Sequence, residues 1–244
     1  MTLPDATMVV SQTLQHYYRE RYGRETVYIP NGANLTPRRP PKRLAEWGLL
    51  PHNYVLYLGR FSPEKNCHLL IGAFEGIATE MKLVLAGGSS HSDDYVEGLR
   101  HHQSEQIRLL PWVSGEDLDE LLSNAALFVL PSDLEGLSLA LLDAMAAGVC
   151  VLTSDIPENK EVVEGAGFTF RRGDQSDLAR VLDVLLRNPG LRREMAAKAE
   201  QRIRAQYLWP GIARSIDNAY YEVLGWNRRE PAPAAGVESQ SPAA

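Results

Sequence analysis

The sequence predicts an α/β protein with a Rossmann-like, doubly wound parallel sheet of about six strands and helices on both faces. Short apolar runs alternate with helical patterns between residues 54 and 170. The runs are apolar throughout instead of alternating with polar residues, which is typical of parallel strands that are covered on both faces. Right-handed crossovers through the intervening helices then place all the strands in one sheet.

Each predicted element follows from its pattern and from the turn residues that bound it. The predicted strands are 54–58, 82–86, 107–110, 126–130, 149–153 and 167–170. The predicted helices between them are 67–78, 93–102, 115–123, 138–147 and 157–164. Three further helices are predicted after the last strand, at 175–187, 189–207 and 209–224.

The start of the chain differs from the rest. A helix is predicted at 11–22 and a strand at 25–29, which together are too little to bury a core. A proline- and arginine-rich stretch follows and is typical of a linker. The predicted divisions are a remnant of a preceding lobe at 1–35, a linker at 36–53, the Rossmann-like domain at 54–208, a C-terminal helix at 209–226 and a disordered tail at 227–244.

Composition excludes several classes of protein. The chain has 244 residues and a formal net charge of −6, whereas a nucleic-acid binder normally carries a basic face. The two cysteines, Cys67 and Cys150, lie far apart, so we expect no disulfide framework and a reducing cytoplasm. The first residues lack a signal-peptide pattern, and no apolar run is long enough to span a membrane.

Two carboxylates stand out where a ligand site is expected. Ligands of doubly wound sheets bind beyond the carboxyl ends of the strands, and Glu135 follows the strand at 126–130. The next helix, which Ser138 can cap, is apolar except for Asp143, so that carboxylate must be paired or must face a cleft. The alternatives are that Glu135 only stabilises the helix N-terminus and that Asp143 pairs with a nearby basic side chain.

The first strand-to-helix loop offers two cations. Gly59 permits a tight turn, and Arg60 and Lys65 place positive charge at the carboxyl end of the first strand, which suits a diphosphate. The alternative is that both are solvated surface cations, one of them paired with Glu64. The glycine-rich turn at 86–90 is not a G-x-G-x-x-G motif, which argues against a nicotinamide or flavin dinucleotide.

Other chemistries have weak support. The histidines near 91 and at 101–102 lack the spacing of a helical metal chelate and lie in polar stretches, so we expect solvated surface and no metal site. Ser132 and Ser138 lack the G-x-S-x-G context of a serine hydrolase. Cys67 begins a helix but has no evident base nearby, so we expect it to pack.

Four segments together resemble the nucleotide-sugar-dependent retaining glycosyltransferases of family four, which have the two-lobed GT-B fold. The segments are IPNGAN at 29–34, YLGRFSPEKN at 57–66, LPSDLEGLSLALLDAMAAGVCVLTSD at 130–155, and Tyr-Leu-Trp at 207–209. The likeness covers about residues 9 to 225 and assigns 54–208 to the donor-binding domain. It implies that 209–226 crosses back to an N-terminal lobe, most of which we expect to be missing.

The resemblance implies a role for each matching residue. Arg60 and Lys65 would contact the donor diphosphate and stabilise its growing charge, and Glu135 would bind sugar hydroxyls. We treat these three as the catalytic candidates. Asp143 would hold the ribose hydroxyls, although the family usually has a longer glutamate there. The remaining donor-binding candidates are Gly59, Val113, Gly136, Leu137 and Ser138. No metal or other cofactor is implied.

The resulting expectation is transfer of a sugar from a nucleotide-diphosphate sugar to a glycan or lipid-linked acceptor, in cell-surface polysaccharide or glycolipid assembly. Either a separate acceptor-binding lobe or a second copy of the chain would complete the site. The first alternative is a non-catalytic lobe that binds nucleotide sugar or docks to a partner, and a weaker one is a sugar-nucleotide epimerase. We expect a cytoplasmic location, with the inner face of the membrane as an alternative.

Overall fold

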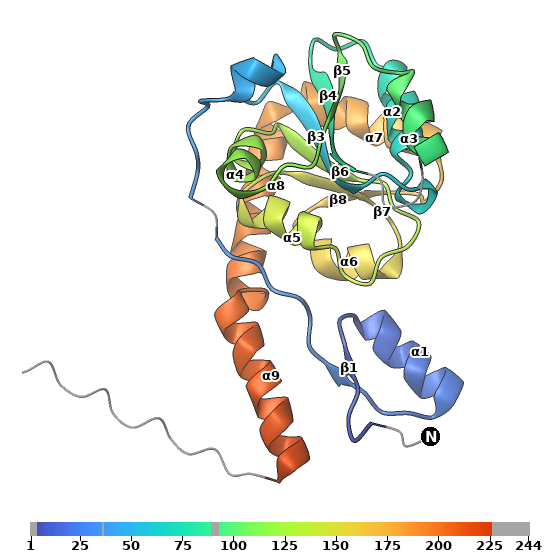
Figure 1. The fold of residues 1–244 in the computed structure, drawn as a ribbon, viewed down its shortest axis with the longest axis vertical. Coiled ribbons are helices and arrows are strands. Elements are labelled where there is room, and N and C mark those ends of the chain that lie inside the picture. Colours follow the sequence, from blue (N-terminus) through green and yellow to red (C-terminus); the bar gives the residue numbers. More distant parts are fainter. Residues whose placement is uncertain (1–3, 36, 89–92, 226–244) are drawn as a thin grey trace, which may run out of the picture.

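The computed structural model describes residues 4–35, 37–88 and 93–225 (Figure 1). The predicted tail at 227–244 and residues 89–90 of the glycine-rich turn lie outside these ranges. Six parallel strands form one sheet in the order β5-β4-β3-β6-β7-β8, which confirms the predicted fold class. The strands are β3 (Tyr54–Arg60), β4 (Lys82–Gly88), β5 (Ile107–Leu110), β6 (Leu127–Leu130), β7 (Val151–Ser154) and β8 (Phe168–Phe170).

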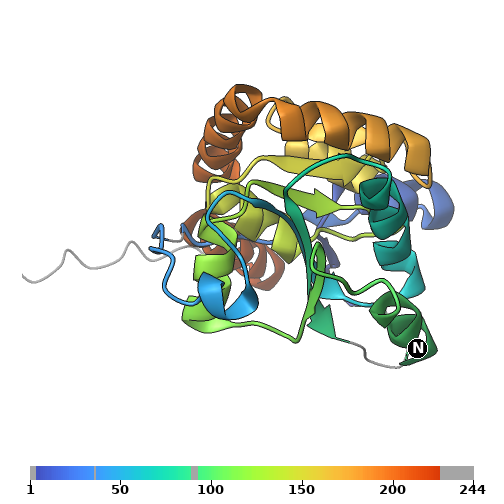
Figure 2. The same ribbon diagram turned by 90° about the horizontal axis from the view of Figure 1, so that it is seen from above.

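Helices lie on both sides of this sheet, as Figure 2 shows from above. Contacts between α2 and α7 and between α5 and α8 join helices that are far apart in the sequence. The helices of the domain are α2 (Cys67–Glu75), α3 (Asp93–Arg100), α4 (Gly115–Ser123), α5 (Leu139–Ala146), α6 (Pro157–Val163), α7 (Gln175–Arg187) and α8 (Pro189–Gln206). Most predicted helices are therefore correct to within a few residues at their ends.

The first strand of the six-stranded sheet, β3, continues further than predicted. The sequence places Gly59 and Arg60 in a loop, whereas both belong to β3, paired with Gly87 and Gly88 of β4. Glycines at this point let the two backbones approach closely, because a Cβ atom on Gly87 would lie 1.8 Å from the carbonyl oxygen of Gly59. The ladder therefore continues through a glycine that the sequence pattern indicates as a turn.

The N-terminal segment is a small unit of its own. A parallel pair of short strands, β1 (Met8–Val9) and β2 (Val27–Tyr28), flanks α1 (Gln12–Tyr22). β1 was not predicted, because a strand of two residues is too short to give a sequence pattern. Figure 1 shows this unit below the sheet, on the side of α6, and α1 contacts α6.

The last helix, α9 (Trp209–Leu224), leads away from the sheet toward this unit. Ile29 packs with Ile212 and Ala219 in an apolar cluster separate from the main core. The backbone is also joined here, by a bridge between Ala33 and Leu208. The predicted helix at 209–224 is confirmed.

The predicted linker is held against the domain. The buried carboxylate of Glu120 on α4 accepts hydrogen bonds from the backbone N–H groups of Lys42, Arg43 and Leu44, at 2.7, 2.6 and 3.0 Å. An ion pair joins Arg43 to Asp117 on the same helix. A short 3₁₀ helix, η1 (Leu44–Trp47), which was not predicted, follows at once. This part of the chain is therefore anchored to α4 and is not a free spacer.

Candidate functional site

The catalytic candidates meet where the direction of chain winding reverses. From β3 the chain proceeds to β4 and β5 on one side, then returns to β6 on the other side of β3. Such a switch point opens a crevice at the carboxyl ends of the two central strands. Arg60 ends β3, Lys65 ends the short 3₁₀ helix η2 (Pro63–Lys65), and Glu135 follows β6. All three therefore lie at the carboxyl-terminal end of the sheet.

An ion pair joins two of these residues. The Nζ atom of Lys65 lies 2.7 Å from Oε1 of Glu135, and the side chains are only 14% and 9% exposed. Screening by solvent is weak at such exposure, so each charge depends on the other. The alternative that Lys65 is a solvated cation is therefore wrong. Glu64 instead accepts a hydrogen bond from Ser62, which lowers the pKa of its carboxyl.

The two loops that carry the pair are also joined by their backbones. The N–H of Asp133 donates to the carbonyl of Glu64 at 2.8 Å, and the Asn66 amide donates to the carbonyl of Pro131 at 3.2 Å. Asn66 is buried and adopts a left-handed backbone conformation between η2 and α2. The relative position of Lys65 and Glu135 is thus fixed by contacts beyond the ion pair itself.

The backbone of Arg60 is held by a buried tyrosine, whereas its side chain is exposed. The hydroxyl of the fully buried Tyr57 donates to the carbonyl of Arg60 at 2.8 Å. A Cβ atom on Gly59 would lie 2.8 Å from the same hydroxyl, so only glycine fits there, with φ +154. Among the described residues, the Arg60 guanidinium forms no ion pair or hydrogen bond, which leaves it available to an anion.

The start of α5 presents uncommitted backbone donors. Ser138 caps the helix as predicted, accepting from the N–H of Leu141. In the described part of the chain, no group accepts a hydrogen bond from the N–H groups of Gly136, Leu137 or Ser138. Free N–H groups at a helix N-terminus attract anionic and hydroxyl oxygens. The N-terminal unit borders this loop, since Asn31 donates to the Leu137 carbonyl at 3.2 Å.

Asp143 is half-buried on α5 and unpaired. No ion pair or side-chain hydrogen bond to it is found among the described residues, so the alternative of a basic partner is wrong. Burial, and to a smaller extent the neighbouring charge of Asp119, raise the pKa of Asp143 to about 6. A carboxylate that is kept partly dry without a partner costs stability, which is typical of a residue retained for a ligand.

A pocket lies at the ends of β3, β4 and β5. Its volume is about 450 Å³, and its lining includes Phe61, Gly87, Leu110 and Trp112. Trp112 is 65% exposed, so its ring is free to stack on a flat ligand. Val113, the predicted residue of this loop, is half-buried next to it and does not line the pocket.

Three neighbours of the site were missed by sequence reasoning. Val10 approaches Gly136, whose Cβ atom would lie 3.5 Å from it, and Asn31 holds the Leu137 carbonyl. Tyr57 supports Arg60 from below the loop. The segment at 29–34 was recognised, but its contact with a loop about one hundred residues later has no local signal. Tyr57, two positions before Gly59, has the sequence pattern of an ordinary core residue.

Reactive groups of other kinds are unsupported in the described residues. No group of three or more His, Cys, Asp or Glu side chains there is arranged to hold a metal ion. Burial raises the pKa of the Cys67 thiol to about 12, so it packs as expected. His102 is exposed and contacts Glu75. No helix within the described ranges has both the length and the apolar character to cross a bilayer.

Known proteins similar to this chain are sugar-transferring enzymes. It is 29% identical to an O-antigen chain mannosyltransferase B from Escherichia coli over 204 residues, covering 80% of this chain and 53% of the relative. It is 29% identical to a phosphatidyl-myo-inositol mannosyltransferase from Mycobacterium leprae over 225 residues, covering 88% and 59%. The chain thus spans somewhat more than half the length of these relatives.

Solved structures share the fold. A sucrose-phosphate synthase from Thermosynechococcus elongatus superposes with a TM-score of 0.81 at 25% identity, covering 91% of this chain and 59% of that one. HepE from Anabaena, solved with UDP and glucose, gives a TM-score of 0.84 at 21% identity, covering 90% and 64%. Both agree with the Rossmann-like lobe of a GT-B fold.

The family is shown by a match that spans all six strands of the sheet. The family model for glycosyl transferases group 1 matches residues 46–202. This range begins before β3 and ends within α8, so it contains the Lys65–Glu135 pair, Asp143 and the pocket at Trp112. The chain belongs to the family of glycosyl transferases group 1.

Proposed function

We propose that this chain is the donor-binding part of a retaining family-four glycosyltransferase, which moves a sugar from a nucleotide-diphosphate sugar to a glycan or lipid-linked acceptor. The observation that carries the proposal is the largely buried Lys65–Glu135 pair at the switch point, together with Arg60 at the end of β3, whose guanidinium has no partner among the described residues. Mannosyl transfer by two relatives supports the class of reaction. Cell-surface polysaccharide or glycolipid assembly is the proposed setting.

The chemistry follows from where charge develops. When the glycosidic bond of the donor breaks, the leaving diphosphate gains negative charge. Arg60 and Lys65 would neutralise that charge, and the free N–H groups at the start of α5 would bind its oxygens or those of the sugar. Glu135, held by Lys65, would accept hydrogen bonds from sugar hydroxyls. Two cations and a helix N-terminus would thus perform the role that a metal ion has in other transferases.

The nucleoside would extend along the same carboxyl-terminal end of the sheet. Asp143 would accept hydrogen bonds from the ribose hydroxyls, a contact for which its carboxylate, without a partner among the described residues, is suited. The base would enter the pocket at the ends of β3, β4 and β5 and lie near Trp112 and Val113. A more complete enzyme would add an N-terminal lobe on the side of α1 and α9.

Calorimetric titration with UDP, GDP and ADP tests this proposal. We expect one of the three nucleotides to bind the purified chain, and Arg60→Ala to weaken binding about 10- to 100-fold, because a charge-assisted contact is lost. Arg214→Ala, which removes an exposed arginine of α9, is the matched control and should leave binding unchanged. Absence of binding by all three nucleotides at millimolar concentration would contradict the proposal.

A non-catalytic lobe that only holds a nucleotide sugar remains the second candidate. The observation that favours it is that every catalytic candidate lies on one lobe, while the chain spans little more than half of its relatives. Radiolabelled sugar transfer to a glycan acceptor distinguishes the two candidates. Turnover that depends on Arg60 supports the enzyme, whereas nucleotide binding without turnover or hydrolysis supports the binding lobe.

A further inference from the structure

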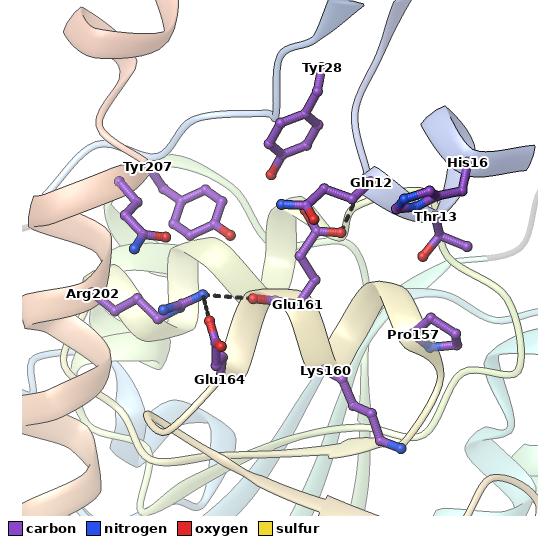
Figure 3. A pocket seen from close by; sticks show the side chains of 11 residues that line it. Gln12, Thr13, His16, Tyr28, Pro157, Lys160, Glu161, Glu164, Arg202 and Tyr207 are labelled. Atoms are coloured by element: carbon purple, nitrogen blue, oxygen red, sulfur yellow. Dashed lines mark hydrogen bonds and ion pairs between the residues drawn. The ribbon is translucent and has the colours of Figure 1, made fainter. Parts of the chain in front are cut away.

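A second pocket lies between the N-terminal unit and the Rossmann-like domain. Its volume is about 710 Å³, and α1, β2, α6 and α8 all contribute to it. Figure 3 shows the side chains that the argument uses, namely Gln12, Tyr28, Lys160, Glu161, Arg202 and Tyr207. These are hydrogen-bonding groups together with two aromatic rings, which is the kind of lining that suits a hydroxyl-rich ligand.

The cations of this pocket already have partners. The Arg202 guanidinium donates to the carbonyl oxygens of Val162 and Glu161 at 2.7 and 2.8 Å, and pairs with Glu164 at 3.1 Å. Lys160 lies 3.7 Å from a carboxylate oxygen of Asp155. A phosphate or carboxylate ligand would have to compete for these cations. A neutral ligand would not.

The Glu161 carboxylate and the two phenols, in contrast, lie close to one another and keep hydrogen-bonding capacity in reserve. Glu161 accepts a hydrogen bond from the Gln12 N–H through Oε2, but its Oε1 atom is buried without a partner among the described residues. Figure 3 shows the hydroxyls of Tyr28 and Tyr207 pointing toward this carboxylate. Burial, and to a smaller extent the nearby Glu161 carboxylate, raise the pKa of both phenols, so both are neutral hydrogen-bond donors at physiological pH. An unsatisfied buried carboxylate oxygen costs free energy that a ligand hydroxyl would recover.

The pocket is next to the proposed donor site. α6 follows β7, the strand beside β6, so the start of α6, which lines the pocket, and Glu135 both lie at the carboxyl-terminal end of the sheet. The N-terminal unit borders both places, because Val10 approaches Gly136 and Gln12 binds Glu161. A molecule in this pocket would therefore lie beside the loop that is proposed to hold the donor sugar.

We propose that the pocket bounded by Tyr28, Glu161 and Tyr207 binds the acceptor, and that it takes a neutral, polyhydroxylated end group such as a sugar ring. The inference rests on the proposed function for its meaning as an acceptor site. Glu161 accepts hydroxyl hydrogens of the bound ring, and the two tyrosines donate to its oxygens or pack against its apolar face. The paired cations select against a phosphorylated end group.

A titration followed by heteronuclear NMR tests the pocket with methyl α-D-mannopyranoside as the neutral probe and inorganic phosphate as the anionic probe. We expect the glycoside to shift the Gln12 N–H signal in a saturable manner, because that group lies on Glu161. Tyr28→Phe and Tyr207→Phe are each expected to weaken its binding about 3- to 10-fold, the effect of losing one hydrogen bond. Tyr17→Phe makes the same change at an exposed tyrosine of α1 outside the pocket and should have no effect.

Nucleoside diphosphate binding is measured on the same samples, so that two failures are distinguished. Normal nucleotide binding without saturable glycoside shifts, or shifts that both tyrosine variants leave unchanged, would overturn the pocket assignment alone. Saturable phosphate binding at Gln12 that excludes the glycoside would also overturn it. Glycoside binding without any nucleotide binding would reject the proposed function, and with it the description of the pocket as an acceptor site.

Discussion

Lys65→Met is expected to lower both the stability of the fold and its affinity for a nucleoside diphosphate. Removal of one member of a buried ion pair leaves the other charge without a partner, and Glu135 is only 9% exposed. We expect a loss of about 2 to 4 kcal/mol in the free energy of unfolding, toward the lower end for such pairs because both side chains keep some contact with water. Affinity for the nucleotide should fall about 10- to 100-fold.

The double variant Lys65→Met/Glu135→Leu separates these two effects. It removes both charges, so unfolding in urea should return close to the wild-type free energy, while nucleotide affinity stays low. Lys198→Met is the matched control. Lys198 pairs with Glu194 at the same 2.7 Å, but the two side chains are 50% and 61% exposed, so its loss should cost below about 1 kcal/mol. Equal losses for Lys65→Met and Lys198→Met would contradict the importance that we assign to the pair.

Asp143→Asn is expected to stabilise the fold near neutral pH and to weaken ligand binding. Burial raises the pKa of Asp143 to about 6, so its ionised form is disfavoured in the folded state. The amide has nearly the same shape without the charge. We expect a gain on the order of 1 to 3 kcal/mol in the free energy of unfolding at pH of about 7.5. Loss of the acceptor for ribose hydroxyls should reduce nucleotide affinity at least about fivefold.

The pH dependence of this gain has a definite sign. Between the ordinary carboxyl value of about 4 and the raised pKa of about 6, the folded chain holds the Asp143 proton and the unfolded chain does not. As the pH rises through this interval, the free energy of unfolding of the wild type therefore falls. The stability advantage of Asp143→Asn grows over the same interval and is constant at higher pH. Asp94→Asn, at an exposed position of α3, is the control. A flat difference from pH of about 4 to 7 would contradict the raised pKa.

Local pattern was enough for elements that have clear boundary residues. The helix Gln175–Arg187 has its predicted bounds, and in the structure Asp174 caps it and an Asn-Pro pair follows it. The helix Trp209–Leu224 likewise begins with Trp-Pro and ends at Gly225, which adopts a left-handed conformation. In both cases the signals stand directly at the two ends of the helix in the sequence and need no tertiary contact.

Features that depend on strand order were beyond the sequence. Lys65 and Glu135 were both candidates, but their contact spans 70 residues and exists because β6 returns to lie beside β3. For the same reason Gly59 was assigned to a loop, since only its pairing with Gly87 shows that the strand continues. The free Asp143 carboxylate depends on what surrounds α5 in three dimensions. Periodicity reports which face of an element is buried, not which residue lies opposite it.

The most direct measurement of the central claim is a map of nucleoside diphosphate binding on the backbone amides by heteronuclear NMR. We expect the largest shifts in three segments that are distant in sequence, namely 59–65 at and after the end of β3, 111–115 after β5 and 136–143 at the start of α5. Gly136, Leu137 and Ser138 should be among them, because no group in the described ranges accepts a hydrogen bond from their N–H groups. Shifts that leave these segments unaffected, or that appear only in the pocket between α1 and α6, would contradict a donor site built on Arg60, Lys65 and Glu135.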